Sequence, residues 1–316
     1  MDRLEAMATL LAVVEAGSLS AASRRLGTPL ATVSRRLSEL EALVQTRLLH
    51  RSSRRITLTD AGTAYIQACR RILDQIDEAE SAASGEYRSP KGELTVTAPM
   101  SLGRQHIVPI AVSFLEAYPE VQLQLRLTDR LIDLQEQHID LAVRIGALHD
   151  SSLIARQVAT VRYVVCASPA YVARRGRPQT PEDLATHDCV FFAGLPNSGM
   201  WAFPNRGAVV RVPIHSRLFV DATEAVLDAG LAGAGVVRLF SFQIADAVRE
   251  GRLTVLLEGF EPPPVPINII HLEGAPQPLK IRAFFDFAAP QLKARLALEH
   301  DPKSLNQKGI FADEVL

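Results

Sequence analysis

The segment that decides the fold of the N-terminal region spans residues 26–41 and reads LGTPLATVSRRLSELE. Gly27 ends one helix, and a new helix follows at once. Thr28 is expected to cap this helix and Pro29 to occupy its first turn, where no N–H donor is needed. The apolar residues that recur at helical spacing predict its buried face: Val33, Leu37, Leu40 and Val44. Two short helices joined by a tight glycine turn are typical of a helix-turn-helix.

The outward residues of this helix predict contacts with DNA. At about 100° per residue, Ala31, Thr32 and Arg35 point away from the buried face, and such residues in the first turns reach base edges in a major groove. We expect Arg35 to contact guanine, and Ala31 and Thr32 to contact thymine methyl groups or polar edges. Ser34 and Arg36, on the flanks, are expected to contact phosphates. The alternative is an ordinary amphipathic surface helix, which the Gly-Thr-Pro turn and the arginines disfavour.

Two helices precede this segment. The first is expected to end at Gly17 and to bury a stripe at helical spacing: Leu4, Met7, Leu11 and Val14. The second is expected to be capped by Ser18 and to carry three residues on its inner face: Leu19, Ala22 and Leu26. Downstream, residues 47–58 read RLLHRSSRRITL, and their alternation about the Ser-Ser turn predicts a short hairpin. Its basic residues are expected to form a wing along the backbone or minor groove: Arg51, Arg54 and Arg55.

Charge and composition agree with this interpretation. Residues 20–58 hold eight arginines and two glutamates, a net charge of +6, in a chain of 316 residues with a net charge of −1. Such a patch is typical of one nucleic-acid-binding module attached to another domain, although composition alone does not exclude a solvated basic face. The chain is 47% hydrophobic, enough for about two globular domains. We expect a cytoplasmic protein, since no signal peptide or membrane span is evident and three cysteines lie far apart.

Residues 59–92 predict a long dimerisation helix followed by a hinge. Thr59 is placed to cap the helix, and a heptad-like seam follows: Ile66, Cys69, Leu73, Ile76 and Ala83. The helix is too long and its stripe too narrow for packing on one small domain, so we expect it to pair with a second copy and form a homodimer. The helix gives way at Ser84-Gly85, and residues 89–92 form a linker.

Residues 93–300 alternate between strands and helices. Strands at 94–98, 121–127 and 141–145, with a helix at 107–118, predict an α/β fold with a largely parallel sheet. A second unit has a strand at 163–167, a strand at 209–220 and a helix at 223–231. The chain then returns through a strand at 266–271 and a last helix from Leu279. We therefore expect lobe one at 93–160 and 266–300, lobe two at 161–265, and a flexible tail at 301–316.

Eight motifs together resemble the LysR-type transcriptional regulators. Three lie in the N-terminal region, at residues 26–41, at 47–51 (RLLHR) and at 58–62 (LTDAG). Five lie in the α/β region, at residues 98–103, 140–146, 167–171, 230–235 and 280–284. The resemblance reaches about residue 290. It implies a winged helix-turn-helix, a linker helix that pairs two subunits, and a two-lobed effector domain similar to periplasmic solute-binding proteins. Function as a homodimer or homotetramer on operator DNA is implied as well.

An effector is expected between the two lobes, because ligands of open α/β lobes sit at the carboxyl ends of strands. Ser101 and Thr223 head helices, whose N–H groups suit a carboxylate, so we expect an anionic small molecule. Arg238 is either an anion clamp or a surface arginine. Trp201 and Phe203 are expected to wall the crevice, with a core role as the favoured alternative for Trp201. The expected effector-binding residues are Pro99, Met100, Ser101, Leu102, Gly103, Ile145, Gly146, Phe203, Ala222, Thr223, Val237 and Arg238.

Two other classes of protein are weighed against a regulator. A solute-binding or carrier protein would need an export signal, and an α/β enzyme would need a catalytic constellation. The glycines at 230, 233 and 235 have the order GxxGxG and follow no first strand, so they do not predict a dinucleotide site. His187 and Cys189 lack a second pair of ligands at zinc spacing. The sequence therefore predicts a DNA-binding regulator without metal, cofactor or enzymatic activity.

Overall fold

The computed structural model describes residues 2–51, 56–84, 89–130, 132–147, 153–193, 199–205, 208–272 and 278–300. The chain forms two compact units, Met1–Ser89 and Pro90–Leu316, and each is described by itself. The predicted tail, residues 301–316, and the wing residues Arg54 and Arg55 lie outside the described residues.

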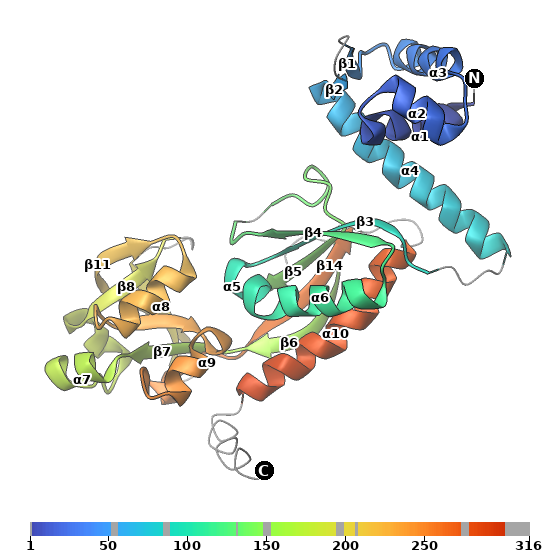
Figure 1. The fold of residues 1–316 in the computed structure, drawn as a ribbon. Helices are drawn as coiled ribbons and strands as arrows, with labels where there is room; N and C mark the ends of the chain where they lie inside the picture. Colours follow the sequence, from blue (N-terminus) through green and yellow to red (C-terminus); the bar gives the residue numbers. More distant parts are fainter. Residues whose placement is uncertain are drawn as a thin grey trace, which may run out of the picture. The chain divides into compact units, whose positions relative to one another are not determined.

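The first unit is a three-helix domain with a hairpin and a long helix (Figure 1). Its elements are α1 (Arg3–Ala16), α2 (Leu19–Leu26), α3 (Leu30–Leu43), β1 (Leu49–Arg51), β2 (Ile56–Leu58) and α4 (Asp60–Ser84). Gly17 and Gly27 end α1 and α2 in the left-handed conformation, and the Ser18 hydroxyl accepts from the Ala21 N–H at 3.2 Å, as predicted. The hairpin is antiparallel, with Leu49 opposite Leu58, also as predicted.

The cap predicted at Thr28 is wrong. Pro29 holds the N-cap position of α3, and no side chain caps this helix. The Thr28 hydroxyl instead donates to the Leu26 carbonyl at 3.3 Å, and the Thr28 carbonyl accepts from the Ser23 hydroxyl at 2.6 Å. Thr28 therefore stabilises the turn between the two helices instead of the first turn of α3.

The buried face of α3 is confirmed, whereas that of α1 is not. Val33, Leu37 and Leu40 are completely buried. In α1, however, the buried aliphatic side chains are Ala6, Leu10, Ala12 and Val13, and Leu4 is exposed. Apolar residues occur on nearly every face of α1, so two stripes were available, and packing on α2, α3 and α4 selects the other one. The predicted inner residue Leu26 is also exposed, because α2 ends at this residue and the chain turns away at Gly27.

Helix α4 is capped as predicted, since the Thr59 hydroxyl accepts from the Gly62 N–H at 2.9 Å. The predicted seam needs a correction. Ile66 and Cys69 are buried within their own chain, and Ile66 belongs to the cluster of α1 and α3. Farther along the helix, Leu73 and Ile76 are half-buried and Ile72 is exposed, so among the described side chains of α4 this later part offers apolar surface to a second copy. The side chain of Ala83, also predicted in the seam, lies outside the described ones.

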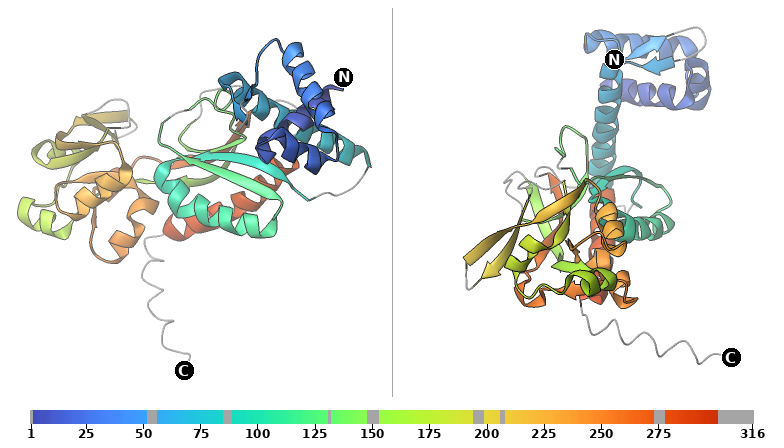
Figure 2. Two further views of the ribbon diagram at one scale, coloured as in Figure 1. Left: turned by 45° about the horizontal axis from the view of Figure 1, so that its top comes forward. Right: turned by 90° about the vertical axis from the view of Figure 1, so that its left-hand side faces the viewer.

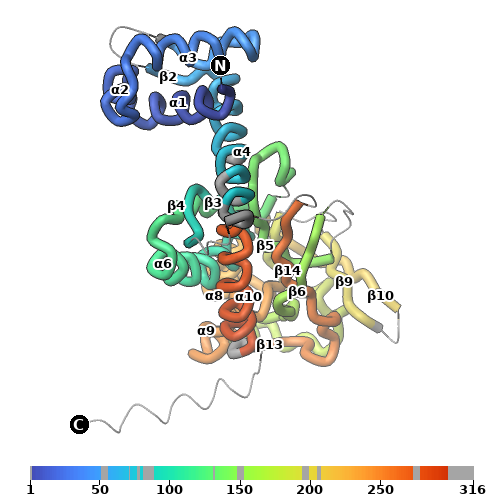
Figure 3. The backbone as a smooth tube through the Cα atoms, turned by 90° about the vertical axis from the view of Figure 1, so that its right-hand side faces the viewer, coloured from blue at the N-terminus to red at the C-terminus, as the bar shows by residue number. Residues whose placement is uncertain are grey.

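Lobe one of the second unit is built on a five-stranded sheet in the order β4-β3-β5-β14-β6. Its strands are β3 (Gly92–Ala98), β4 (Val121–Leu127), β5 (Leu141–Ile145), β6 (Leu153–Val161) and β14 (Val265–Leu272). One face is covered by α6 (Val108–Ala117) and α10 (Leu279–His300), which lie side by side (Figure 3). The rings of Phe114 and Phe284 join these helices at 5.0 Å between centroids, inside the main hydrophobic core.

Lobe two has less regular sheets, which the sequence predicted only in part. Its strands are β7 (Tyr163–Ala167), β8 (Asp188–Phe192), β9 (Met200–Asn205), β10 (Ala208–Pro213), β11 (His215–Val220), β12 (Val237–Phe240) and β13 (Thr254–Leu256). Its helices are α7 (Pro169–Arg175), α8 (Thr223–Leu231) and α9 (Ser241–Arg249). The single strand predicted at 209–220 is in fact two strands: β10 pairs with β9 in a hairpin, and β11 pairs with β8 in parallel.

Two segments cross between the lobes, and Figure 2 shows them joining the two bodies of this unit. Residue Arg162 carries the chain from β6 to β7, and the segment after β13 leads back to β14. Strand β14 runs antiparallel to β5 and β6, because the returning chain enters lobe one from the opposite end. The prediction of a largely parallel sheet therefore holds for β3, β4 and β5 but not for β14.

No single helix in the described ranges is long and apolar enough to cross a membrane. Helices α1 and α2 meet that test only together, and they bend by 120° at their junction. Both helices contribute to the core of the first unit.

Candidate DNA interface and effector crevice

Helix α3 has one face that is buried in the domain and an opposite face that exposes a basic side chain. Val33, Leu37 and Leu40 anchor the helix, and Ala31 and Arg35 are exposed. Thr32 and Ser34 are half-buried at the sides. This is the geometry that a groove-binding helix requires, because its inner face is held by the core and its outer side chains are available.

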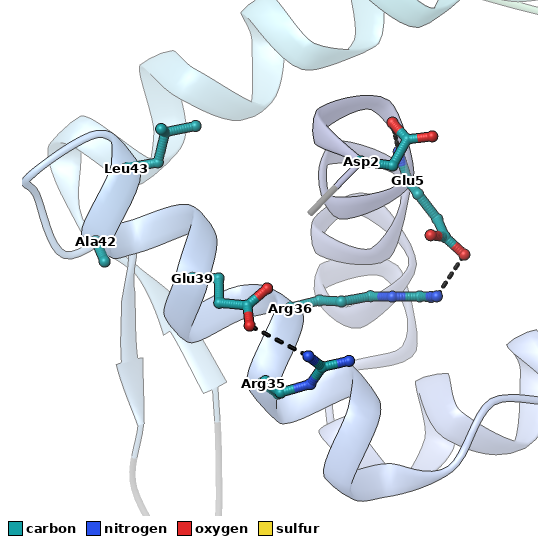
Figure 4. Close-up of a pocket in the computed structure, with 7 residues that line it drawn as sticks. All are labelled: Asp2, Glu5, Arg35, Arg36, Glu39, Ala42 and Leu43. Carbon is teal, nitrogen blue, oxygen red and sulfur yellow. Dashed lines mark hydrogen bonds and ion pairs between the residues drawn. The ribbon is translucent and has the colours of Figure 1, made fainter.

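The two arginines of α3 differ in their surroundings (Figure 4). Arg35 extends to the outside and approaches Glu39, one turn on, with 3.4 Å between Nη1 and Oε1. Arg36 turns toward α1, where its guanidinium pairs with Glu5, and only 20% of its side chain is exposed. The exposed Arg35 pair is weak and easily exchanged, whereas Arg36 ties α3 to α1.

The wing is described in part. Arg51 is the last residue of β1 and lies opposite Ile56. Its side chain lies outside the described part of the structure. Glu41 positions the start of the hairpin from α3, because its Oε1 accepts from the backbone N–H groups of Leu48 at 2.9 Å and Leu49 at 3.1 Å. The sequence by itself indicated no role for Glu41. A carboxylate one helical turn before a loop with unpaired N–H groups is the signal that would have found it.

In the second unit, several predicted effector residues lie where the two lobes meet. Ser101 is buried, and its Oγ accepts from Nε2 of Gln243, on α9, at 2.6 Å. Arg104 approaches Glu224, at the start of α8, with 3.8 Å between Nε and Oε1. Thr223 donates from its hydroxyl to Oε2 of the same Glu224 at 3.2 Å. Lobe one thus contacts the first turns of α8 and α9 of lobe two through these residues.

Charged residues that the sequence reasoning missed also occupy this region. Asp129 follows β4, and its Oδ1 accepts from the Met100 N–H at 2.9 Å. Burial raises the pKa of Asp129 above its usual range, in spite of that hydrogen bond. Burial also lowers the pKa of Arg144, and the nearby Asp129 opposes this shift. The sequence could have indicated Asp129, because it follows the carboxyl end of a parallel strand, where ligand sites are commonly found.

Arg238 lies against two aromatic rings. Its Cζ lies 4.8 Å from the ring centroid of Tyr163 and 5.2 Å from that of Phe203, which fits cation–π contacts on two sides. Burial lowers the pKa of Arg238, and its Nε is buried with no hydrogen-bond acceptor among the described residues. Arg238 is half-buried, so both an anion clamp and an arginine that reaches the surface across these rings stay open.

Other predicted residues serve as structural support. Leu102 and Val237 are completely buried in the cores of lobe one and lobe two, and Phe203 is 2% exposed in the core of lobe two. Gly103 is packed so tightly that a Cβ would lie 2.2 Å from Leu127 Cδ2. Ile145 packs against the core of lobe one.

The remaining predicted residues lie at the ends of β3, β5 and β11. Pro99 is half-buried just after β3, and Ala222 is the N-cap of α8. Gly146 has a φ of 120°, which favours glycine, and its N–H donates to the Pro266 carbonyl at 2.8 Å. Within the described part of the chain, no three His, Cys, Asp or Glu side chains come together as metal ligands would.

Comparison with known proteins matches both units to one family. Residues 4–63 match the model described as "Bacterial regulatory helix-turn-helix protein, lysR family", and residues 88–293 match "LysR substrate binding domain". An HTH-type transcriptional regulator of Xanthomonas campestris is 37% identical over 284 residues, which cover 89% of this chain and 83% of that protein. The regulator CrgA of Neisseria meningitidis is 32% identical over 290 residues, covering 91% and 96%.

Solved structures agree. CrgA superposes with a TM-score of 0.60 at 32% identity, covering 91% of this chain and 98% of that one. Full-length AphB of Vibrio cholerae gives a TM-score of 0.58 at 28% identity, covering 90% and 98%. These relatives are transcriptional regulators, so the comparisons favour neither a solute-binding protein nor an enzyme. The chain belongs to the LysR family and is a DNA-binding transcriptional regulator with a two-lobed effector-binding domain.

Proposed function

We propose that α3 reads the operator through Arg35, with Ala31 and Thr32 beside it, while Ser34, Arg36 and the wing arginines contact phosphates. The observation that carries the proposal is the burial of Val33, Leu37 and Leu40 beneath an exposed Arg35. Because the Arg35–Glu39 pair is exposed, Arg35 exchanges it for a base edge at little cost. Arg36 supports the same surface from the side, through its pair with Glu5.

The test begins with duplexes selected from a random pool by the full-length protein. Affinity for the selected site and for unrelated DNA is then measured by fluorescence anisotropy at one salt concentration. Arg35→Ala is expected to weaken binding to the selected site by roughly fivefold to over a hundredfold, with little change on unrelated DNA. Ser34→Ala is the control and should weaken both duplexes alike, as a phosphate contact does. An unchanged ratio of the two affinities in Arg35→Ala would remove the base-reading role.

We further propose that a small anionic effector binds in the crevice, near Ser101, Thr223 and Arg238. Arg238 supports this, because its half-buried side chain lies against two aromatic rings and its Nε has no hydrogen-bond acceptor among the described residues. Pro99, Met100, Gly146 and Ala222 would line the same region, at the ends of strands and helices. The contacts of Ser101 with Gln243 and of Arg104 with Glu224 would rearrange when a ligand enters.

A thermal-shift screen of metabolites against the full chain would test this site. We expect the stabilising compounds to be carboxylates or phosphates. Arg238→Met keeps the side chain's length and its packing on Tyr163 but removes the charge, so the shift should disappear. If neutral compounds stabilise both proteins equally, the anionic assignment is wrong.

We propose that two chains pair through the later part of α4 and that dimers associate into tetramers through the effector domains. Ile72 on α4 is exposed, and so are Val108 and Val112 on α6 and Leu218 and Phe219 on β11. In the described part of lobe two, β11 pairs only with β8, so its outer edge is open to a second copy. We also propose a cytoplasmic location, because the operator DNA that such a regulator binds lies there.

Sedimentation velocity separates the two interfaces. Ile76→Glu should break the α4 pair and weaken operator binding, since the two DNA-binding domains are then no longer linked. Val112→Glu should reduce tetramers to dimers that still bind one operator. Val209→Glu, at an apolar residue that is also exposed but lies on β10, is the control and should change neither state. Tetramers that persist in Val112→Glu would exclude α6 from the interface.

A further inference from the structure

A cavity of about 390 Å³ lies in lobe two between α9 and strands β7 and β13. None of the expected effector residues lines it. Its volume falls in the usual range for small-molecule sites. Its walls are mostly apolar: Val164, Ile244 and Leu253 are buried at the back, and Val248 and Val255 are half-buried toward the opening.

One end of the cavity carries hydrogen-bonding groups that are not fully used. Ser241 is buried, and its Oγ accepts from the Arg162 N–H at 3.4 Å, which leaves the hydroxyl proton to donate. Arg162 pairs with Glu261, with 2.7 Å between Nη1 and Oε2, while its Nε is buried without an acceptor among the described residues. Buried polar groups without a partner favour a ligand or water that supplies one. A hydroxyl group can accept from one of these donors and donate in turn.

The charges around the cavity cancel. The Arg162 guanidinium is neutralised by Glu261. At the opening, Arg177 and Glu258 are both exposed and of opposite sign, and Arg177 donates to the Val255 carbonyl at 2.8 Å. An anion or a cation would therefore enter a neutral, partly apolar site and remain uncompensated, which is unfavourable. A neutral molecule has no such cost.

We infer that this cavity binds a small uncharged molecule, largely apolar and bearing one hydroxyl group, as a monocyclic phenol does. The ring packs on Ile244, Val248 and Leu253, and the hydroxyl meets Ser241 beside Arg162. This site goes beyond the proposed effector crevice, from which it differs in residues and in ligand charge. It adjoins the crossing between the lobes, because the Ser241 N–H donates to the Arg162 carbonyl at 2.9 Å.

The probes are phenol, fluorobenzene, benzoate and benzylammonium, which share one ring and differ in the charge and hydrogen bonding of a single substituent. Binding to the full-length protein is measured by ligand-observed NMR titration. We expect phenol to bind about three to ten times more tightly than fluorobenzene, as one hydrogen bond provides. The two ions should bind more weakly than phenol.

Two variants and one control locate the site. Val248→Phe fills the opening and should abolish binding of phenol and fluorobenzene. Ser241→Ala should remove the advantage of phenol while leaving fluorobenzene bound, which also shows that α9 remains folded. Val209→Phe makes the same substitution as Val248→Phe at an exposed residue outside the cavity and should leave all affinities unchanged.

Three results would overturn the inference. Benzoate or benzylammonium binding as tightly as phenol would contradict the neutral site. Phenol binding that survives in Val248→Phe would place it elsewhere. If none of the probes shows saturable binding, the cavity is an imperfectly packed groove and not a binding site.

Discussion

Replacing Gly62 by alanine should loosen the whole DNA-binding unit, because α4 begins directly against the backbone of Leu48. A Cβ at residue 62 would lie 2.0 Å from the Leu48 carbonyl oxygen and 2.9 Å from its carbonyl carbon. The contact is with backbone, so no rotamer change relieves it. Since Cβ contacts under 3.0 Å are essentially never observed, α4 and the start of the hairpin must separate by about 1 Å or more.

That separation acts on hydrogen bonds as well. The Leu48 carbonyl accepts from the Thr59 N–H at 3.1 Å, and the Thr59 hydroxyl, which caps α4, donates to the adjacent Arg47 carbonyl at 2.8 Å. Overpacking costs about 1–3 kcal/mol, and a weakened hydrogen bond adds about 0.5–1.5 kcal/mol. We therefore expect Gly62→Ala to lower the free energy of unfolding of this unit by about 2–4 kcal/mol.

Hydrogen exchange read by mass spectrometry measures this free energy for each unit separately. Exchange protection of α1 and α3 should fall by roughly thirty- to nine-hundredfold, while α6 and α10 keep theirs. Gly259→Ala is the matched control, because a Cβ at residue 259 meets nothing within 4 Å. If Gly62→Ala leaves the protection of α1 and α3 unchanged, the close packing of α4 on Leu48 is wrong.

Three further predictions concern the cores and the buried titratable groups. Leu40→Ala should cost about 2–5 kcal/mol, measured by the same exchange experiment, because Leu40 is completely buried in the first unit. Burial raises the pKa of Cys69 to about 11 and those of Cys166 and Cys189 to about 12. A thiol reagent at pH 8 should therefore label the three cysteines only after urea unfolds the protein. Rapid labelling of the native protein would contradict this. Burial lowers the pKa of His106 to about 4, from the 6.5 expected in the unfolded chain. The unfolded state then binds more protons between these pH values, so the second unit should lose about 2 kcal/mol of stability from pH 7.5 to pH 5, and His106→Gln should lose less in urea titrations.

The sequence alone was sufficient to predict the helix-turn-helix. Val33, Leu37 and Leu40 share one face of α3 because their spacing follows the period of the helix, and the opposite face carries polar and basic residues. Gly17 and Gly27 fixed the helix ends for a local reason too, since both adopt a left-handed conformation that few other residues tolerate. The alternating strands and helices likewise predicted two α/β lobes.

Local patterns failed where several solutions satisfied them equally. In α1, the stripe through Leu4 and the stripe through Leu10 are both apolar, and only contact with neighbouring helices buries the second. The seam of α4 showed the same ambiguity: Ile66 and Cys69 fit a helix pair, but their own domain already buries them. The spacing of apolar residues shows which of them share one face of a helix. It does not show which neighbouring element covers that face.

The effector region depended most on tertiary structure. The sequence placed Ser101 and Thr223 near the crevice because they follow strands, which is a rule of chain topology. Nothing local showed that Ser101 meets Gln243, 142 residues away, or that Arg238 lies between the rings of Tyr163 and Phe203. Those contacts join elements that the chain brings together only by crossing between lobes and returning. Their geometry is therefore set by the packing of the folded domain and cannot be derived from spacing along the chain.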